Sequence, residues 1–133
     1  MAKPRRIQRK RVKGWRLPEG ARCVTRPGRF GNPFTLEWAR LADPDMTDAA
    51  AREYAVRAFG AWLTDDGWAS GFRSLDERRA WILANVHTLA GLDLACFCPL
   101  PADGETDYCH ARVLIDLANH PLLYVEADGD SGV

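Results

Sequence analysis

The chain has 133 residues with a formal net charge of zero; 47% of them are hydrophobic and 27% are charged. This length supports one hydrophobic core and is short for two ordinary domains. No apolar run approaches the roughly 18 residues of a membrane-spanning helix, and no apolar segment follows the basic N-terminus as in a secretory signal. We therefore expect a single cytoplasmic domain over residues 5–126, without a membrane partner, and a disordered tail over residues 127–133.

Positive charge is concentrated at the start of the chain. Residues 1–30 contain eleven Lys or Arg and one acidic residue, whereas residues 31–133 contain seven Arg and seventeen acidic residues. We interpret residues 1–16 as a basic arm or edge strand that contacts nucleic acid, because each neutralised phosphate releases counterions. The cations assigned to this contact are Arg5, Arg6, Arg9, Lys10 and Arg11. A solvated charged face, or an arm folded back on the acidic body, is the alternative.

Strands and helices are expected to intermix along the chain. Sparse apolar residues over 5–12 allow an edge strand, and residues 21–25 and 92–98 predict two further strands, the last of them buried. Apolar residues at helical spacing predict helices over residues 48–64, 75–90 and 108–119. The fold class is therefore α/β: a small Rossmann-like sheet of about three to four strands, flanked by about three helices.

Particular side chains are expected to begin the helices or to fill the core. Asp48 is suited to cap the first predicted helix, and Ser74 and Glu77 form a capping-box pattern for the second. Thr106 or Asp107 is expected to cap the third helix. The tryptophans expected in the core or between helices are Trp38, Trp62 and Trp81.

The loop over residues 26–34 is a candidate ligand site because it follows a predicted strand, where open α/β sheets bind ligands. Arg26 and Arg29 are suited to hold a phosphate or carboxylate. Gly31 would allow close approach, and Asn32 could bind a base or ribose edge. The loop matches neither the phosphate-binding loop nor the dinucleotide fingerprint. An ordinary turn-rich connection is the alternative.

A second candidate site contains three cysteines and a histidine. Cys96, Cys98, Cys109 and His110 form a set suited to tetrahedral zinc, although C-x-C is tighter than the usual spacing and adjacent Cys and His residues rarely bind one ion. A second interpretation makes Cys109 a reactive thiol, with His110 or Asp107 as the catalytic acid or base. The third is that these cysteines are small buried hydrophobic residues.

Three blocks of the sequence resemble a family grouped as domain of unknown function 4326, small proteins of actinobacteria and their phages. The blocks are the basic strand over residues 5–10, the loop over residues 26–34 that ends in Gly-Asn-Pro-Phe, and Cys96-Phe97-Cys98 with Cys109-His110. Phe97 stands where the family usually has tryptophan, and the link over residues 99–108 is longer. The resemblance implies a layout similar to Rossmann-like nucleotide-binding domains and no established activity.

The function favoured by these motifs is binding of a nucleotide or nucleic-acid phosphate by the loop over residues 26–34 and the basic arm. That loop and the Cys/His corner follow strands that are expected to end on the same side of the sheet. The second interpretation is an enzyme of glycosidase or transferase type that acts on a nucleotide or modified base. The third is a zinc-stabilised module that binds another protein.

Overall fold

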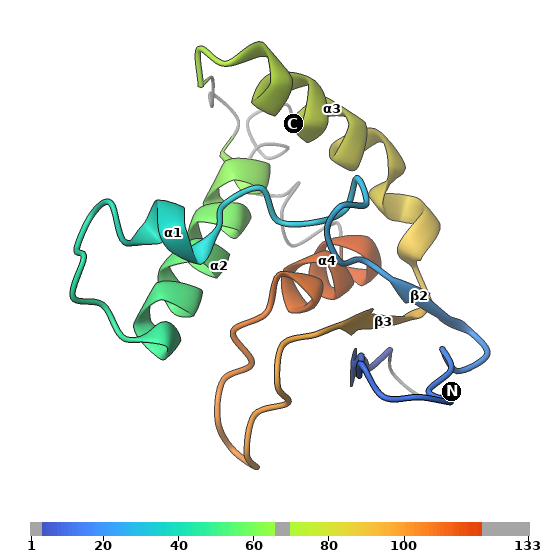
Figure 1. Cartoon of the computed structure of the whole chain (residues 1–133). Coiled ribbons are helices and arrows are strands. Elements are labelled where there is room, and N and C mark those ends of the chain that lie inside the picture. The colour runs from blue at the N-terminus through green and yellow to red at the C-terminus, as the bar shows by residue number, and fades with distance from the viewer. Residues whose placement is uncertain (1–3, 66–69, 121–133) are drawn as a thin grey trace.

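The computed structural model describes residues 4–65 and 70–120. Within these ranges it contains a three-stranded parallel sheet with four α-helices and one 3-10 helix, which confirms the expected small α/β domain (Figure 1). The strands are β1 (Arg6–Gln8), β2 (Ala21–Cys23) and β3 (Asp93–Cys96). The helices are α1 (Leu36–Ala39), α2 (Asp48–Thr64), α3 (Arg73–Asn85), η1 (Val86–Leu89) and α4 (His110–Asn119). The tail expected over residues 127–133 lies outside the described residues.

The central strand of the sheet is β3, and β1 and β2 are the two edges. Both edge strands run parallel to β3, so Gln8 pairs with Cys96 and Cys23 pairs with Ala95. The carboxyl ends of all three strands therefore meet at one edge of the sheet, as the sequence predicts for β2 and β3. Parallel pairing on both sides also explains why β3 has an apolar sequence, because strands in such sheets are buried.

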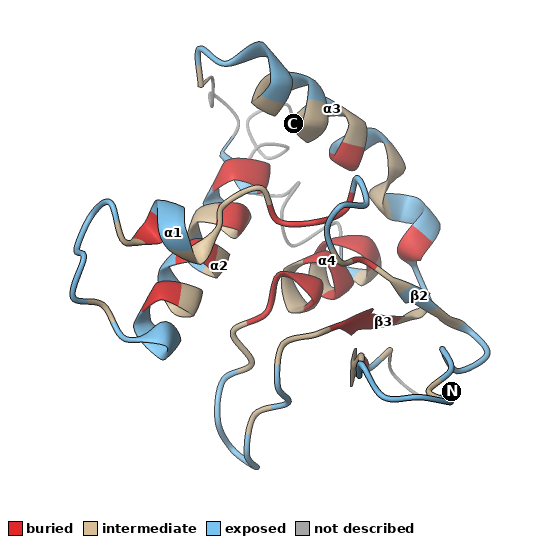
Figure 2. Ribbon diagram, viewed as in Figure 1, coloured by how far each residue is buried: buried red, intermediate tan, exposed pale blue. Residues whose placement is uncertain are grey.

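The hydrophobic core lies between the sheet and the longer helices. Helix α4 contacts β1, β3, η1 and α2. Figure 2 shows that buried residues follow β3, most of α4 and one side of α2. The largest fully buried side chains of the core are Trp62, Phe59, Ile82, Leu89, Leu94 and Leu114. No described helix combines the length and apolar character needed to cross a membrane.

The observed strands are shorter than those expected over residues 5–12, 21–25 and 92–98. The ladder continues for one backbone hydrogen bond beyond each edge strand: Arg9 donates to Cys96 at 2.7 Å, and Val24 donates to Ala95 at 3.1 Å. Beyond Cys96 the chain reaches Pro99, which has no backbone N–H for a ladder. The pattern of apolar residues therefore located the strands correctly, but backbone pairing with the neighbouring strand determined where each strand ends.

All three expected helix caps are wrong. The side chain of Thr47, not Asp48, accepts a hydrogen bond from the backbone of α2, and Asp48 is the first helical residue. The N-cap position of α3 is Phe72, without a side-chain hydrogen bond, so Ser74 lies inside the helix. The N-cap position of α4 is Cys109, and it too makes no side-chain cap hydrogen bond.

The expected helix over residues 75–90 has two parts, α3 and η1, because the last turn tightens to 3-10 geometry. The four-residue helix α1 was not expected, since one turn is too short to display helical periodicity. Of the three tryptophans expected in the core, Trp62 is buried, Trp81 is half-buried and Trp38 is 37% exposed. Trp38 packs its ring against Phe34 and Tyr54 at the surface.

Candidate metal centre and anion pocket

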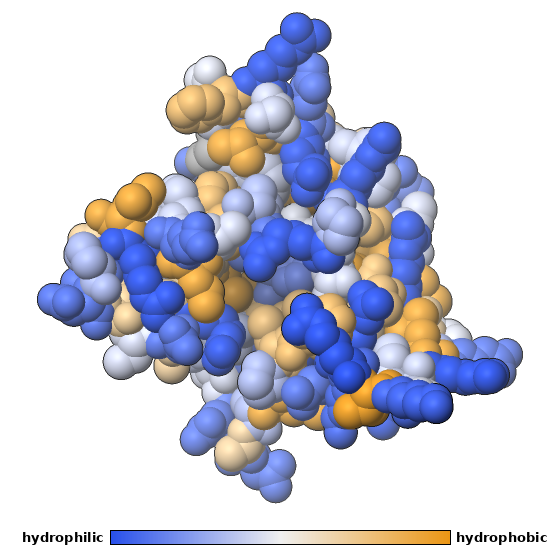
Figure 3. Space-filling view, viewed as in Figure 1, coloured by the Kyte–Doolittle hydropathy of each residue, from blue (hydrophilic) through white to orange (hydrophobic). Residues whose placement is uncertain are grey.

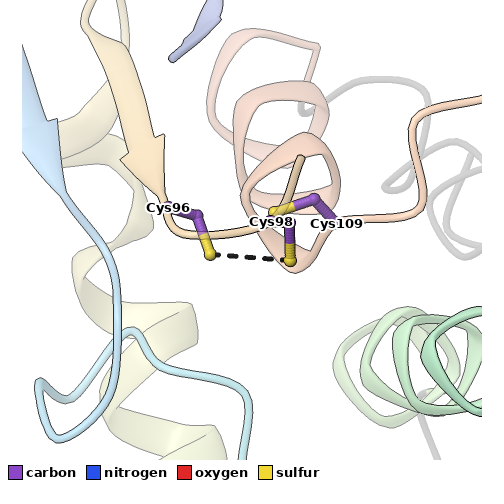
Figure 4. A group of neighbouring side chains, drawn as sticks. All are labelled: Cys96, Cys98 and Cys109. Carbon is purple, nitrogen blue, oxygen red and sulfur yellow. Dashed lines mark hydrogen bonds between the residues drawn. The ribbon is translucent and has the colours of Figure 1, made fainter. Parts of the chain in front are cut away.

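Three cysteines meet at the edge of the sheet where the strands end. Cys96 ends β3, Cys98 lies two residues further on, and Cys109 immediately precedes α4 (Figure 4). Their Sγ atoms all lie within 4.8 Å of one another, and those of Cys96 and Cys98 are 3.8 Å apart. Cys96 and Cys109 are buried, and Cys98 is half-buried. We call these three residues the thiol cluster; its donor atoms are close enough to hold one metal ion.

The buried imidazole of His110 lies beside the thiol cluster. Its Nε2 atom is 2.7 Å from the carbonyl oxygen of Val24. A carbonyl oxygen only accepts hydrogen bonds, so in the neutral ring Nε2 carries the proton and Nδ1 has a free lone pair. Nδ1 lies 3.8 Å from Sγ of Cys96. His110 therefore faces the thiol cluster with its unprotonated nitrogen.

The three thiols of the cluster shift one another's pKa values. Hydrogen bonds from Cys109 and Cys98 hold the pKa of Cys96 far below its usual range. Hydrogen bonds with Cys96 and Cys98, together with burial, raise the pKa of Cys109. The three thiols are therefore coupled, and the negative charge of one raises the pKa of the others.

Arg6 holds the segment after β3 in place. Its side chain is 2% exposed, and its Nε donates to Oδ2 of Asp107 at 2.5 Å. Its two Nη atoms donate to the carbonyl oxygens of Cys98 and Pro99 at 2.8 and 2.6 Å. Burial is the largest single influence and acts to lower the pKa of Arg6, but the hydrogen bond to Asp107 and the charges of nearby groups together raise it. The structure thus places Arg6 in an internal ion pair with Asp107 and not in an exposed basic arm.

A pocket of about 280 Å³ opens beside the thiol cluster. Three arginines from distant segments line it: Arg11 after β1, Arg26 after β2 and Arg52 on α2. Among the described residues, no acidic side chain lines the pocket and none of these arginines forms an ion pair. The other residues that line the pocket include Cys96, Cys98, His110, Asn32, Phe34 and Phe97. Hydrophilic side chains also cover much of the molecular face that Figure 1 presents (Figure 3). Three guanidinium groups around a pocket that no described carboxylate lines make this pocket suitable for an anion.

Asn32 and Gly31 shape the loop after β2. The buried side chain of Asn32 accepts from the backbone N–H of Phe34 at 2.9 Å and donates to the carbonyl of Ala55 at 3.1 Å. A Cβ at Gly31 would lie 2.8 Å from Cγ and 3.0 Å from Cα of Arg26, so only glycine fits there. Nη1 of Arg26 donates to the carbonyl of Asn32 at 2.9 Å. These contacts use the polar atoms of the Asn32 side chain within the fold and position Arg26 at the pocket.

Arg29 is not placed with Arg26. Its guanidinium carbon lies 5.2 Å from the ring centroid of Trp81, and Arg29 lines a different hollow that also includes Arg22 and Phe30. The structure therefore brings Arg26 alone of the two loop arginines to the pocket beside the thiol cluster.

The cations expected in a basic arm have separate positions. Arg5 and Lys10 are exposed. The guanidinium carbons of Arg9 and Arg11 lie 4.7 and 3.9 Å from the ring centroid of Phe97. Contacts of this kind between guanidinium groups and aromatic rings are attractive. Arg9 and Arg11 therefore lie against the segment between Cys96 and Cys98, and residues 6–8 belong to the sheet.

The candidate catalytic residues do not face one pocket. His110 lines the pocket of about 280 Å³, whereas Cys109 and Asp107 line another of about 440 Å³ that also includes residues of α2. A nucleophile and its base must lie within hydrogen-bond reach of the same reacting group. Cys109 and Asp107 share a pocket, but Oδ2 of Asp107 is paired with Arg6, and His110 lines the other pocket.

Two features of the site had no clear signal in the sequence. Arg52 shares a side of α2 with Ala55 and Val56, at the i, i+3 and i+4 spacing, but the sequence does not show that this side borders the thiol cluster. Arg6 occurs in a run of cations, and its burial follows only from the position of the loop after β3 over β1.

Comparison with known proteins identifies a family and no individual relative. A search of curated proteins and a search of solved structures find no match. The family model described as Domain of unknown function (DUF4326) matches residues 7–120, a range that includes the thiol cluster, His110 and all three pocket arginines. The chain therefore belongs to the family Domain of unknown function (DUF4326).

Proposed function

We propose that the chain binds a nucleotide, free or at the end of a nucleic-acid strand, through a phosphate held in the pocket beside the thiol cluster. The observation that carries the proposal is the convergence of Arg11, Arg26 and Arg52 on one pocket that no described carboxylate lines. Guanidinium groups bind phosphate oxygens with paired, charge-assisted hydrogen bonds. The position of the pocket at the carboxyl ends of parallel strands supports the proposal, since open α/β sheets bind ligands there.

The size and lining of the pocket favour a small ligand. Its volume of about 280 Å³ is close to the lower end of the range for small-molecule sites, roughly 300–1,000 Å³. A phosphate with one sugar or one base suits this volume better than a dinucleotide does. Phe34 and Phe97 supply apolar surface for the sugar or base.

Exposed cations extend positive charge away from the pocket. Lys10, Lys13 and Arg16 are all exposed and follow β1 in the sequence. If the nucleotide is the end of a strand, we propose that these side chains contact its neighbouring phosphates, with an affinity that falls as salt rises.

The cofactor that we propose for the thiol cluster is zinc. Thiolate ligands favour zinc, copper(I) or iron–sulfur chemistry over magnesium and calcium, and zinc in particular accepts tetrahedral sulfur and nitrogen ligands. Bound zinc would join the end of β3 to the start of α4 and stabilise one wall of the pocket. Reduced thiols require a reducing compartment, so a cytoplasmic location is part of the proposal.

Isothermal titration calorimetry tests the phosphate site with the full chain. The probes are inorganic phosphate, nucleoside mono-, di- and triphosphates, and a short oligonucleotide with or without a 5′-phosphate. Arg26→Gln and Arg52→Gln should each weaken binding about tenfold or more, because a hydrogen bond to a charged group contributes about 1.5–3 kcal/mol.

Arg29→Gln is the matched control, because it removes the same charge from the same loop outside the pocket. Its affinity should equal that of the parent protein. The proposal fails if no probe binds, or if Arg29→Gln weakens binding as much as Arg26→Gln does. A preference for the 5′-phosphorylated oligonucleotide over mononucleotides would assign the strand end as the ligand.

A further inference from the structure

We infer that the thiol cluster and His110 bind one zinc ion together, with Nδ1 of His110 as the fourth ligand. The inference rests on the proposed zinc cofactor and extends it to a closed, tetrahedral ligand set of three sulfurs and one nitrogen. Such a site has a structural role, because all four coordination positions are taken by the protein.

The distances at Cys96 fit a tetrahedron. Zinc bonds of about 2.3 Å to sulfur and about 2.0–2.1 Å to nitrogen give a sulfur–sulfur separation of about 3.8 Å and a sulfur–nitrogen separation of about 3.6 Å. Sγ of Cys96 is 3.8 Å from Sγ of Cys98 and 3.8 Å from Nδ1 of His110. The three sulfurs of the cluster all lie within 4.8 Å of one another, and His110 reaches the cluster through Cys96, so the full ligand set requires the His110 and cysteine side chains to move closer together.

The hydrogen bond on the far side of the His110 ring supports coordination by Nδ1. Histidines that bind a metal almost always donate their other ring N–H to a carboxylate, a backbone carbonyl or water. Nε2 of His110 makes this contact with the carbonyl of Val24 at 2.7 Å. The contact fixes both the tautomer and the orientation of the ring. The lone pair of Nδ1 is therefore directed toward Sγ of Cys96.

The backbone allows adjacent residues to serve the same ion. Cys109 is extended, with φ −139° and ψ 139°, whereas His110 is the first residue of α4. The change from extended to helical backbone lets both side chains approach Cys96, although neighbouring residues on one strand would point to opposite faces. Figure 4 shows Cys109 at the start of this helix, next to Cys98.

Arg6 holds the backbone of one proposed ligand in place. Its buried guanidinium donates to the carbonyl of Cys98 at 2.8 Å, beside the cluster.

Metal analysis and X-ray absorption spectroscopy on the full chain, purified without a tag under reducing conditions, test the inference. Elemental mass spectrometry should find one zinc per chain. Absorption at the zinc edge should show three sulfur neighbours at about 2.3 Å and one nitrogen neighbour at about 2.0 Å. Both measurements use the parent protein, so they do not depend on whether a variant folds.

Variants separate coordination by His110 from a purely structural role. His110→Ala should lower zinc affinity about tenfold or more, since even the loss of a supporting contact to a ligand costs 10–100-fold, as a rough range. In His110→Ala the nitrogen neighbour should be replaced by an oxygen from water. Cys23→Ser is the matched control, because Cys23 lies at the end of β2 outside the thiol cluster, and its zinc content and spectrum should equal those of the parent.

Each alternative result overturns the inference in a recognisable way. Protein without bound zinc would reject both the cofactor and the ligand set. One zinc with three sulfurs and an oxygen that His110→Ala leaves unchanged would keep the cofactor and reject His110 as a ligand. The phosphate titrations above are read independently of both outcomes.

Discussion

Arg6 is the single residue whose role depends most on its surroundings. In the sequence it is one of several adjacent cations, yet its neighbour Arg5 has a 77% exposed side chain while that of Arg6 is 2% exposed. The difference arises because the segment after β3 covers Arg6, whose guanidinium donates to the carbonyls of Cys98 and Pro99, whereas Arg5 precedes β1. Arg6 therefore contributes to the fold of the site, whereas Arg5 contributes to surface charge.

Arg6→Ala should lower the free energy of unfolding by about 3–5 kcal/mol, because it leaves the carboxylate of Asp107 and two carbonyl groups without their partner. Arg5→Ala is the control, and as an exposed substitution it should change stability by less than about 0.5 kcal/mol. Chemical denaturation measures both. Equal effects of the two substitutions would show that the internal ion pair does not stabilise the protein.

Gly31 and Gly60 form a second matched pair. Gly31→Ala should destabilise the protein by about 1–3 kcal/mol, because the new Cβ would meet the backbone of Arg26 at 3.0 Å. Gly60→Ala, inside α2, meets only Val113 at the ordinary contact distance of 3.9 Å and should stabilise by about 0.5–1 kcal/mol. Thermal unfolding of the two variants should therefore shift in opposite directions; a Gly31→Ala variant as stable as the parent would contradict this account of the loop.

At the level of secondary-structure elements, α2 has the closest agreement between expectation and structure. Its observed bounds, Asp48–Thr64, equal the predicted ones. The helix is long, and its buried residues recur at helical spacing, so periodicity alone locates it. The predicted cap, Asp48, is nevertheless wrong, and Thr47 caps the helix. Both residue types are suitable caps, and the sequence does not show which one has the extended backbone.

Thr47→Ala should therefore lower stability by about 1 kcal/mol, the usual contribution of a side-chain cap. Ser74→Ala serves as the control, since Ser74 lies within α3 and caps nothing, and its effect should stay within about 0.5 kcal/mol. Urea denaturation midpoints compare the two. A larger loss in Ser74→Ala than in Thr47→Ala would reverse the assignment of the caps.

At the scale of the whole molecule, residues 6–9 and the exposed cations that follow them have separate roles. Residues 6–8 form an edge strand of the sheet, and Arg9 still donates a backbone hydrogen bond to Cys96. Lys10, Lys13 and Arg16 are exposed. The basic segment is therefore partly structural and partly available to a partner.

Deletion of residues 1–9 should unfold or strongly destabilise the protein, because it removes β1 and the ion pair of Arg6. Replacement of Lys10, Lys13 and Arg16 together by serine should leave the unfolding midpoint unchanged. The same triple variant should reduce the salt dependence of binding to the 5′-phosphorylated oligonucleotide by up to about two in the slope of log K against log salt. Circular dichroism and filter-binding titrations measure these effects; a deletion variant that folds normally would contradict the role of β1, and an unchanged salt slope would exclude these cations as phosphate contacts.

The sequence by itself determined the α/β class, the order of the three main helices, the buried strand before the cysteines and the group of cysteines that could hold a metal ion. These features depend on local periodicity, on turn residues and on the clustering of cysteines near His110, all of which can be read from neighbouring residues. Tertiary structure alone decided which polar side chains are paired within the fold, as Arg6, Asp107 and Asn32 are. It also decided which side chains line the pocket, as Arg52 does. The physical reason is that burial and charge compensation depend on segments distant in the chain: Arg6 and Asp107 are separated by 101 positions yet share one ion pair, and no local pattern contains that pairing.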